Sequence, residues 1–286
     1  MTDTLRAAWD AHAADYARVF APVTGFIAQN MFRMTAARLP AQSRILDVAC
    51  GAGELTIAAA LHARSMDNAP SAHGTIWATD FSAEMIALTE QAVAAHGVAE
   101  FVRCEVHDGQ QLALADETFD AVFSSFGIFL FPDRQAGWRE AARVLRPGGM
   151  FVTSVWRDPE HNALARQQMA PLLASLPPRL LDLPPRPDWI GLLSAEGLMA
   201  DVCGAAPFVD PEISVISATL VVPHPFAMWD AMQGNPVTNR LLVGCTADEL
   251  ADVARAVVAH FEALAGGAHR PLLLDASAHV LVARRG

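Results

Sequence analysis

A short apolar run that leads directly into a glycine turn and a helix-forming segment constrains the fold of this chain most. The run is Ile45–Ala49, the turn Cys50–Gly53 and the helix-forming segment Leu55–Leu61. Further strands are expected over Thr75–Thr79, Phe101–Glu105, Phe119–Ser124 and Met150–Trp156, with helices over Ala83–Ala95 and Ala136–Leu145. Parallel neighbours need crossover connections, which are usually helical, so this alternation predicts an α/β, doubly wound, mostly parallel sheet covered on both faces.

The flanking segments are interpreted as additions to one domain over residues 1–286, with a cofactor-binding core at 41–156. Helical periodicity over Leu5–Phe20 and Phe26–Leu39 predicts a cap of two helices within residues 1–40. Residues 157–286 are expected to supply strands over Ile213–Val222 and His279–Arg284, and helices over Phe226–Met232 and Asp248–Leu264. We interpret residues 226–264 as a mobile helical lid, and Arg64–His73 and Leu176–Pro187 as surface connections.

Charge and composition exclude several classes of function. The chain carries 20 basic residues against 31 acidic ones, whereas a protein that binds phosphate backbones needs clustered basic side chains, so no nucleic-acid partner is expected. Its apolar runs, such as Ile128–Phe131, are far shorter than the roughly 20 residues of a membrane span. The start of the sequence lacks a basic and apolar leader, so we expect a cytoplasmic protein, either monomeric or homodimeric. The four cysteines have no paired short spacing, and no metal site is predicted.

The turn after the first strand is the first candidate site. Glycines at 51 and 53 allow a ligand to approach the backbone and the helix N-terminus closely. Asp47 lies in the preceding strand, and Thr56 stands where a dinucleotide-binding fingerprint has its third glycine, so the pattern departs from that of a nicotinamide site. A tight connection without any ligand is the alternative for this turn considered alone.

Two acidic positions follow the next strands. Asp80 ends the second strand, where a carboxylate can accept hydrogen bonds from a ribose diol. Because Ser82 already suits the cap of the next helix, Asp80 is free to be a binding candidate. Asp108 suits an exocyclic amine and has the small Gly109 beside it, although a turn aspartate is the alternative interpretation.

At these positions the chain resembles the class I S-adenosylmethionine-dependent methyltransferases, and more narrowly the ubiquinone/menaquinone-type branch and related small-molecule methyltransferases. The resemblance rests on spaced blocks in family order, namely Ile45–Gly53, Ala78–Met85, Asp108–Gly109, Phe119–Gly127 and Arg139–Gly149. It covers about residues 40–156. It implies a Rossmann-like, seven-stranded sheet with one antiparallel edge strand, and S-adenosyl-L-methionine as the cofactor.

The resemblance also implies a role for each matching residue. The amino-acid part of the cofactor would lie against the Gly51–Gly53 turn, with Asp47 orienting its ammonium and Asp80 binding its ribose. Adenine packing is implied for Phe81 and Met85, contact with the adenine amine for Asp108, and a backbone carbonyl contact for Ser124. Ala49 stands where the family usually has Gly, and Gly109 where it usually has Ala. Both residues are small, so we expect altered packing and retained binding.

The acceptor is expected to be a small, largely apolar molecule that is methylated on oxygen, nitrogen or carbon. Candidates for the acceptor pocket are Tyr16, Phe20, Phe126, Phe129, Phe131, Trp156, Met228, Trp229 and Met232, with core packing as the alternative for most. Tyr16, the only tyrosine, is favoured because a buried hydroxyl needs a partner. His161 is the candidate base, with His12 and His224 behind it. A cyclase or binding module that shares the fold, and a nicotinamide-dependent oxidoreductase, are the alternative functions.

Overall fold

The computed structural model describes residues 3–40, 42–66, 76–181 and 188–286. Its strands are β1 (Ile45–Val48), β2 (Ile76–Asp80), β3 (Val102–Val106), β4 (Phe119–Ser125), β5 (Leu145–Trp156), β6 (Phe208–Val222) and β7 (Leu272–Arg285). Its helices are α1 (Asp3–Val19), α2 (Ala21–Ala36), α3 (Glu54–Ser65), α4 (Ala83–Ala95), α5 (Arg134–Val144), α6 (Ala163–Ser175), α7 (Ala195–Ala205), α8 (Pro225–Gly234), α9 (Pro236–Asn239) and α10 (Ala247–Ala265). Short 3-10 turns are η1 (Ala99–Phe101), η2 (Ile128–Leu130), η3 (Pro178–Leu180) and η4 (Asp188–Leu193).

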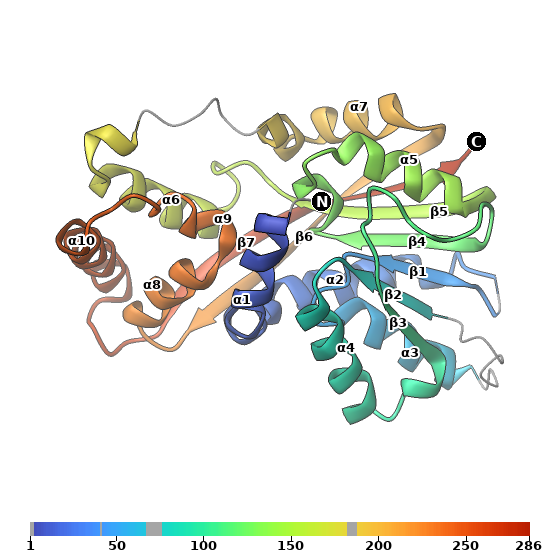
Figure 1. Ribbon diagram of the computed structural model, residues 1–286, viewed down its shortest axis with the longest axis horizontal. Helices are drawn as coiled ribbons and strands as arrows, with labels where there is room; N and C mark the ends of the chain where they lie inside the picture. The colour runs from blue at the N-terminus through green and yellow to red at the C-terminus, as the bar shows by residue number, and fades with distance from the viewer. Residues whose placement is uncertain (1–2, 41, 67–75, 182–187) are drawn as a thin grey trace.

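The strands form one seven-stranded sheet in the order β3-β2-β1-β4-β5-β7-β6. β1 pairs in parallel with β2 and β4, and the parallel pairing continues to β3 on one side and to β5 on the other. β7 is antiparallel to both of its neighbours, so the antiparallel strand lies one place in from the edge strand β6. Figure 1 shows α5 and α7 on one side of the sheet and α2, α3 and α4 on the other. The mostly parallel, doubly wound sheet predicted from the sequence is confirmed.

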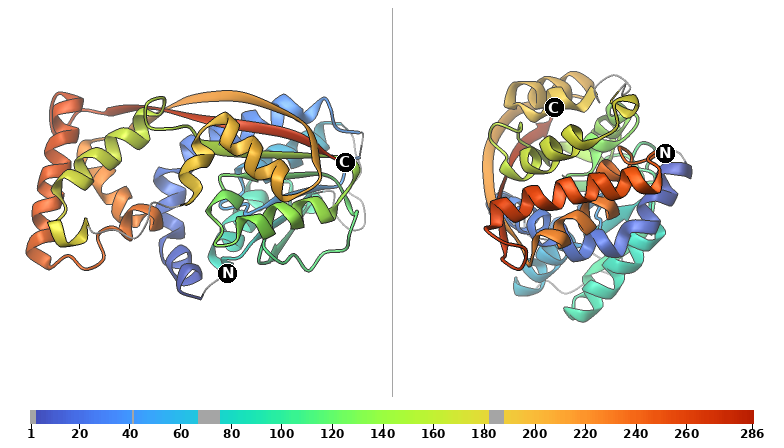
Figure 2. Two further views of the ribbon diagram at one scale, coloured as in Figure 1. Left: turned by 90° about the horizontal axis from the view of Figure 1, so that it is seen from above. Right: turned by 90° about the vertical axis from the view of Figure 1, so that its left-hand side faces the viewer.

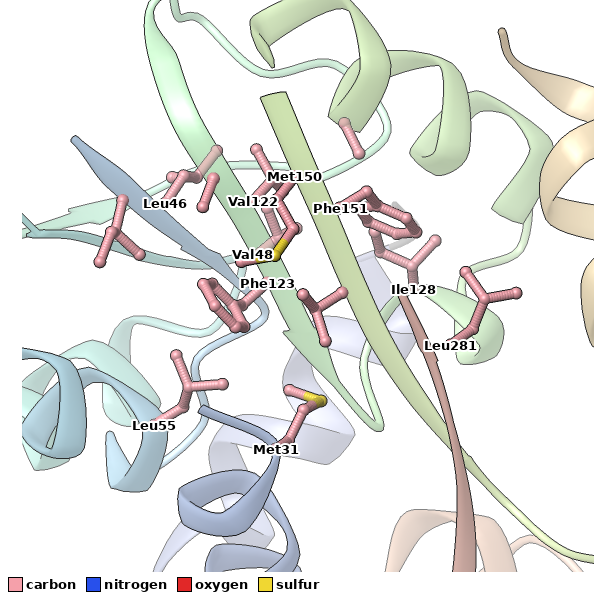
Figure 3. Packing of buried hydrophobic residues seen from close by; sticks show 14 of the residues in the cluster. Met31, Leu46, Val48, Leu55, Val122, Phe123, Ile128, Met150, Phe151 and Leu281 are labelled. Carbon is pink, nitrogen blue, oxygen red and sulfur yellow. The ribbon is translucent and has the colours of Figure 1, made fainter. Parts of the chain in front are cut away.

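The main core fills the space between the sheet and these helices. Met31 of α2 and Leu55 of α3 pack toward Val48 and Phe123 at the centre of the sheet, while Phe151 lies further along the same cluster (Figure 3). All four residues of β1 and five of the seven residues of β4 are buried, because both faces of a parallel sheet are covered. The core therefore holds the carboxyl ends of β1, β2 and β4 rigidly next to one another.

The last two strands are longer than the sequence predicted. β6 begins at Phe208 instead of Ile213, and β7 begins at Leu272 instead of His279. β5 pairs with β7 only as far as Ala278, whereas β6 and β7 continue to pair with each other as far as Leu272. A two-stranded ribbon thus extends beyond the sheet (Figure 1).

A second hydrophobic core lies on this ribbon. Buried Leu220 and Leu274 of the ribbon meet Trp229 of α8 and Phe261 of α10, and α6 completes the cluster. Figure 2 shows this helical group beyond the end of the main sheet, away from α5 and α7. The region interpreted as a lid therefore has a core of its own, which includes Trp229 and Leu242.

Two predicted connections lie partly outside the described residues, namely Arg64–His73 and Leu176–Pro187, as does the expected start of the second strand at Thr75. Within the described ranges, no helix is both long enough and apolar enough to cross a lipid bilayer.

Candidate donor and acceptor cleft

An open cleft lies at the carboxyl ends of β1, β2 and β4, with α1 as one of its walls. It encloses about 750 Å³ of space, part of it continuous with bulk solvent. Its lining residues are Leu5, Trp9, Tyr16, Thr24, Ala28, Asp47, Ala49, Cys50, Gly51, Glu54, Leu55, Asp80, Phe81, Met85, Ser125, Phe126, Gly127, Leu130 and Phe131. The cleft thus combines most of the predicted cofactor residues with an aromatic and aliphatic wall.

The turn between β1 and α3 forms the floor of the cleft. Three of its residues adopt left-handed backbone conformations, with φ of 58° at Ala49, 58° at Gly51 and 92° at Gly53. Gly51 presents open space on its Cβ side and donates its N–H to Asp80 Oδ2 at 3.1 Å. Gly53 does not line the cleft, and a Cβ there would lie 3.0 Å from Thr89 of α4. Gly51 therefore leaves the floor open, whereas Gly53 allows α3 and α4 to pack closely.

Asp47 is buried at the bottom of the cleft. Its Oδ2 accepts a hydrogen bond of 2.6 Å from the Thr56 hydroxyl. Asp47 and Thr56, the two residues that depart from the nicotinamide fingerprint, are therefore directly linked, because Thr56 holds the Asp47 carboxylate in place. Burial raises the pKa of Asp47 to about 7 in spite of that hydrogen bond.

Asp80 ends β2 and faces the turn. It accepts one hydrogen bond from the N–H of Gly51 and another of 3.0 Å from the N–H of Ser82. Ser82 caps α4 by accepting the N–H of Met85 at 3.1 Å, as the sequence predicted, and its hydroxyl donates to Asp10 of α1. Burial raises the pKa of Asp80 to about 6. Since each carboxylate oxygen has a second lone pair, Asp80 can still accept hydrogen bonds from a ligand.

Glu54 is a cleft residue that the sequence prediction missed. It is the first residue of α3, and a Cβ on Gly25 of α2 would lie only 2.5 Å from its Cγ, so Gly25 leaves room for its side chain. Burial raises the pKa of Glu54 to about 7. An acidic residue directly after a glycine turn was a usable signal, because carboxylates favour helix N-termini.

Asp47, Glu54 and Asp80 form the acidic end of the cleft. Among the described residues that line the cleft, none is a lysine, arginine or histidine. A buried carboxylate is stable in its ionised form only when a positive charge or strong donors compensate for lost solvation. The acidic end of the cleft therefore suits a cationic ligand.

Aromatic side chains dominate the other wall. Tyr16 packs edge-on against Trp9 at 5.7 Å, and its hydroxyl donates to Thr24 Oγ1 at 3.2 Å. Phe126, which directly follows β4, stacks on Trp156 at a ring-centroid distance of 4.1 Å and has a φ of 55°, an unusual conformation for a bulky residue. Such strained residues often occur at functional sites, and here the strain sets the direction of a ring that lines the cleft.

Several predicted site residues lie outside the cleft lining. Ser124 is fully buried, with its hydroxyl and carbonyl bound to Ile128 and Thr153, and the neighbouring Ser125 lines the cleft instead. Asp108 accepts hydrogen bonds from Gln110. Gly109, like Asp108, is not part of the wall.

His161 also lies outside the lining of the cleft. Its ring bonds Asp158 at 2.9 Å, and about half of its side chain is exposed. A catalytic role for His161 thus finds no support in its position and stays a prediction. His12 bonds Asn239 at 3.3 Å, and His224 caps α8.

The predicted acceptor residues divide into two groups. Tyr16, Phe126 and Phe131 line the cleft. The others pack in the two hydrophobic cores or against Tyr16, namely Phe20, Phe129, Trp156, Met228, Trp229 and Met232. Among the described residues, no group of three or more histidine, cysteine, aspartate and glutamate side chains is arranged to hold a metal ion.

Comparisons with known proteins agree with this geometry. Residues 46–153 match the methyltransferase domain family. Over 116 residues the chain is 36% identical to the ubiquinone/menaquinone biosynthesis C-methyltransferase UbiE of Geotalea daltonii, covering 41% of this chain and 46% of that protein. The chain therefore spans about half the length of the curated relatives it matches.

Solved structures extend the likeness of the fold to most of the chain. BH2331 of Bacillus halodurans superposes with a TM-score of 0.56 at 16% identity, covering 90% of this chain and 98% of that one. The [4+2]-cyclase SpnF superposes with a TM-score of 0.50 at 20% identity, covering 91% and 80%. At these identities the structures show the fold alone. Residues 46–153 of this chain therefore match the methyltransferase domain family, and the fold around them resembles that of the class I S-adenosylmethionine-dependent methyltransferases.

Proposed function

We propose that this chain transfers a methyl group from S-adenosylmethionine to a small, largely apolar acceptor. The observation that carries the proposal is the cleft itself. It is lined by two buried carboxylates, by the partly buried Glu54 and by an aromatic wall, with no basic side chain among the described lining residues. The donor carries a sulfonium and an ammonium group, which suit the acidic end. Its ribose diol suits Asp80, and Phe81 and Met85 offer apolar surface to its adenine. The residues present therefore fit the cofactor.

Electrostatics favour this donor over a nicotinamide cofactor. A dinucleotide would place its anionic pyrophosphate on the glycine turn, next to Asp47, Glu54 and Asp80. At an effective dielectric constant of about 20, two like charges about 5 Å apart repel by roughly 3 kcal/mol. Repulsion of this size from each ionised carboxylate would abolish useful affinity, whereas a cationic donor gains from the same charges.

The residues of the chain contribute binding, orientation and the exclusion of water. When bound, S-adenosylmethionine supplies an electrophilic methyl group on a sulfonium. The acidic end and the Gly51 turn hold the donor, while Trp9, Phe126 and Leu130 form a wall that keeps water from the reacting atoms. Holding the acceptor nucleophile about 3 to 3.5 Å from the methyl carbon in line can supply much of the rate enhancement.

Tyr16 is proposed to orient the acceptor rather than to deprotonate it. Burial raises the pKa of its hydroxyl above the ordinary value of 10, so the group stays protonated at neutral pH. No histidine is found among the described residues that line the cleft. We therefore propose an acceptor whose nucleophile reacts without a histidine base. The acidic charge balance of the chain, 31 acidic against 20 basic residues, also favours a small molecule over nucleic acid.

Calorimetric titration with S-adenosylhomocysteine, S-adenosylmethionine and NAD tests the proposal. We expect both adenosyl ligands to bind at micromolar or lower concentrations and NAD to show no binding at a hundredfold higher concentration. Binding of NAD with similar affinity would overturn the assignment of the donor. Binding of the donor without consumption of its methyl group by any acceptor in a cell extract would support a cyclase or binding module instead.

A further inference from the structure

Phe131 occupies a position that only two glycines make available. A Cβ on Gly109 would lie 2.6 Å from Cε2 and Cζ of Phe131, and a Cβ on Gly137 of α5 would lie 2.9 Å from its Cδ2. Contacts this short do not occur between real side chains, so the ring sits directly against two bare stretches of backbone. Neither glycine has a left-handed φ, which makes the requirement steric rather than conformational.

The position of the Phe131 ring is fixed by two loops, one that carries Gly109 and one that carries Phe131 itself. Gln110 donates its backbone N–H to Asp108 Oδ1 at 2.9 Å, and its side-chain Oε1 accepts the N–H of Asp133 at 2.7 Å. The loop that carries Gly109 is thereby tied to the loop that carries Phe131. Since Phe131 is 8% exposed and lines the cleft, this junction forms part of the cleft wall.

The ring borders the cleft together with Phe81 and Met85, whose elements follow β2. Gly109 replaces the alanine usual in the resembling family, and its bare backbone is what lets the Phe131 ring withdraw from the cleft. A side chain at 109 would collide with the ring, and because Phe131 lines the cleft whereas Gly109 does not, we expect the ring to be displaced into the cleft. The residue at 109 therefore controls how deep the cleft is at this end.

Building on the proposed function, we propose that Phe131 is a wall of the donor's adenine subsite and that glycine at 109 sets the depth of that subsite. The class of ligand is a planar purine, which stacks on aromatic faces irrespective of further contacts. Gly109 acts through the ring and is a positioning residue. Gly137 supports the ring from the side of α5.

A double-mutant cycle tests this proposal by calorimetry with S-adenosylhomocysteine. We expect Gly109→Ala to weaken binding at least tenfold, because the displaced ring fills the subsite. Phe131→Ala should weaken binding about tenfold through lost stacking. Adding Gly109→Ala to Phe131→Ala should cost less than a further twofold, since no ring remains to be displaced. If the double variant lost affinity by the product of the two single losses, the proposal would be overturned. A Phe131→Ala variant with unchanged affinity would overturn it as well.

Two further variants separate this role from general effects on folding. Phe129→Leu alters a buried ring that packs against Trp189 and does not line the cleft, so it should lower the melting temperature and leave affinity unchanged. Gly204→Ala in α7 places its Cβ in open space and should change neither. 5′-Methylthioadenosine, which lacks the amino-acid part, should lose affinity with Phe131→Ala by the same factor as S-adenosylhomocysteine. A loss of affinity confined to S-adenosylhomocysteine would contradict an adenine contact. If S-adenosylhomocysteine did not bind the unmodified protein at all, the proposed donor itself would be refuted.

Discussion

Replacing Glu54 by Gln should stabilise the free protein and weaken donor binding at the same time. The substitution keeps the shape of a side chain that lies against Gly25 and removes its charge. Burial raises the pKa of Glu54 from 4.5 to about 7, which corresponds to a cost of roughly 3 kcal/mol for keeping it ionised in the folded chain. At pH 8, the free energy of unfolding of the ligand-free variant should therefore exceed that of the wild type, by about 1 to 3 kcal/mol.

The effect on binding has the opposite sign. A hydrogen bond to a charged group contributes about 1.5 to 3 kcal/mol, so loss of the Glu54 charge should weaken binding of S-adenosylmethionine about 10- to 100-fold. Urea titration gives the first quantity and calorimetry at the same pH gives the second. Glu90→Gln, on the exposed surface of α4, changes the net charge equally and serves as the control. If Glu54→Gln were no more stable than wild type and bound the donor equally well, the acidic end would have no role in recognition.

Four further outcomes follow from the structure. Asp80→Asn should lower donor affinity more than tenfold, because its carboxylate accepts from the turn and faces the cleft, and unchanged calorimetric affinity would remove it from the site. Ala49→Gly should raise the free energy of unfolding by about 1 kcal/mol in urea titration by relieving a φ of 58°, and a decrease would contradict this. Folded pKa values of about 7 for Asp47 and Glu54 lie above their unfolded values. Their stabilising contribution is thus complete below about pH 4 and lost as pH rises through 7, so the melting temperature of the ligand-free protein should fall between pH 5 and 8, less steeply in Glu54→Gln. Hydrogen exchange within residues 226–264 should slow when S-adenosylhomocysteine and acceptor bind together, and equal protection with and without ligands would make this region part of the rigid structure.

The parts of the fold that local patterns determine were predictable. The 17 residues from Ile45 to Leu61 predict a strand, a glycine turn and the start of a helix. The structure has both the strand β1 and the helix α3 in this segment. The different roles of Asp80 and Ser82 could be predicted from the sequence, because Asp80 ends β2 whereas Ser82 caps α4. These features depend on neighbours in the chain, which a single sequence contains.

Features that depend on distant partners were missed or misplaced. The Leu272–Ser277 half of β7 forms a strand because β6 pairs with it and the α6, α8 and α10 helices cover one face, and no local pattern reports that. Successive side chains of a strand point to opposite faces, so Ser124 is buried in the core whereas Ser125 lines the cleft. Glu54 lines the cleft because Gly25, 29 positions earlier, leaves room for it. Aromatic residues such as Trp229 suited either a pocket or a core, and packing decided for the core.

The measurement that tests the central claim most directly is the fate of a labelled methyl group. The protein is incubated with S-adenosylmethionine carrying a radioactive methyl and with the small-molecule fraction of a cell extract, and label is counted in organic-soluble product, protein and nucleic acid. Asp80→Asn serves as the matched negative control. The structure predicts label in the organic-soluble fraction that depends on the intact Asp80. Label that accumulates in nucleic acid or protein, or that does not leave the donor although the donor is bound, would contradict methyl transfer to a small apolar acceptor.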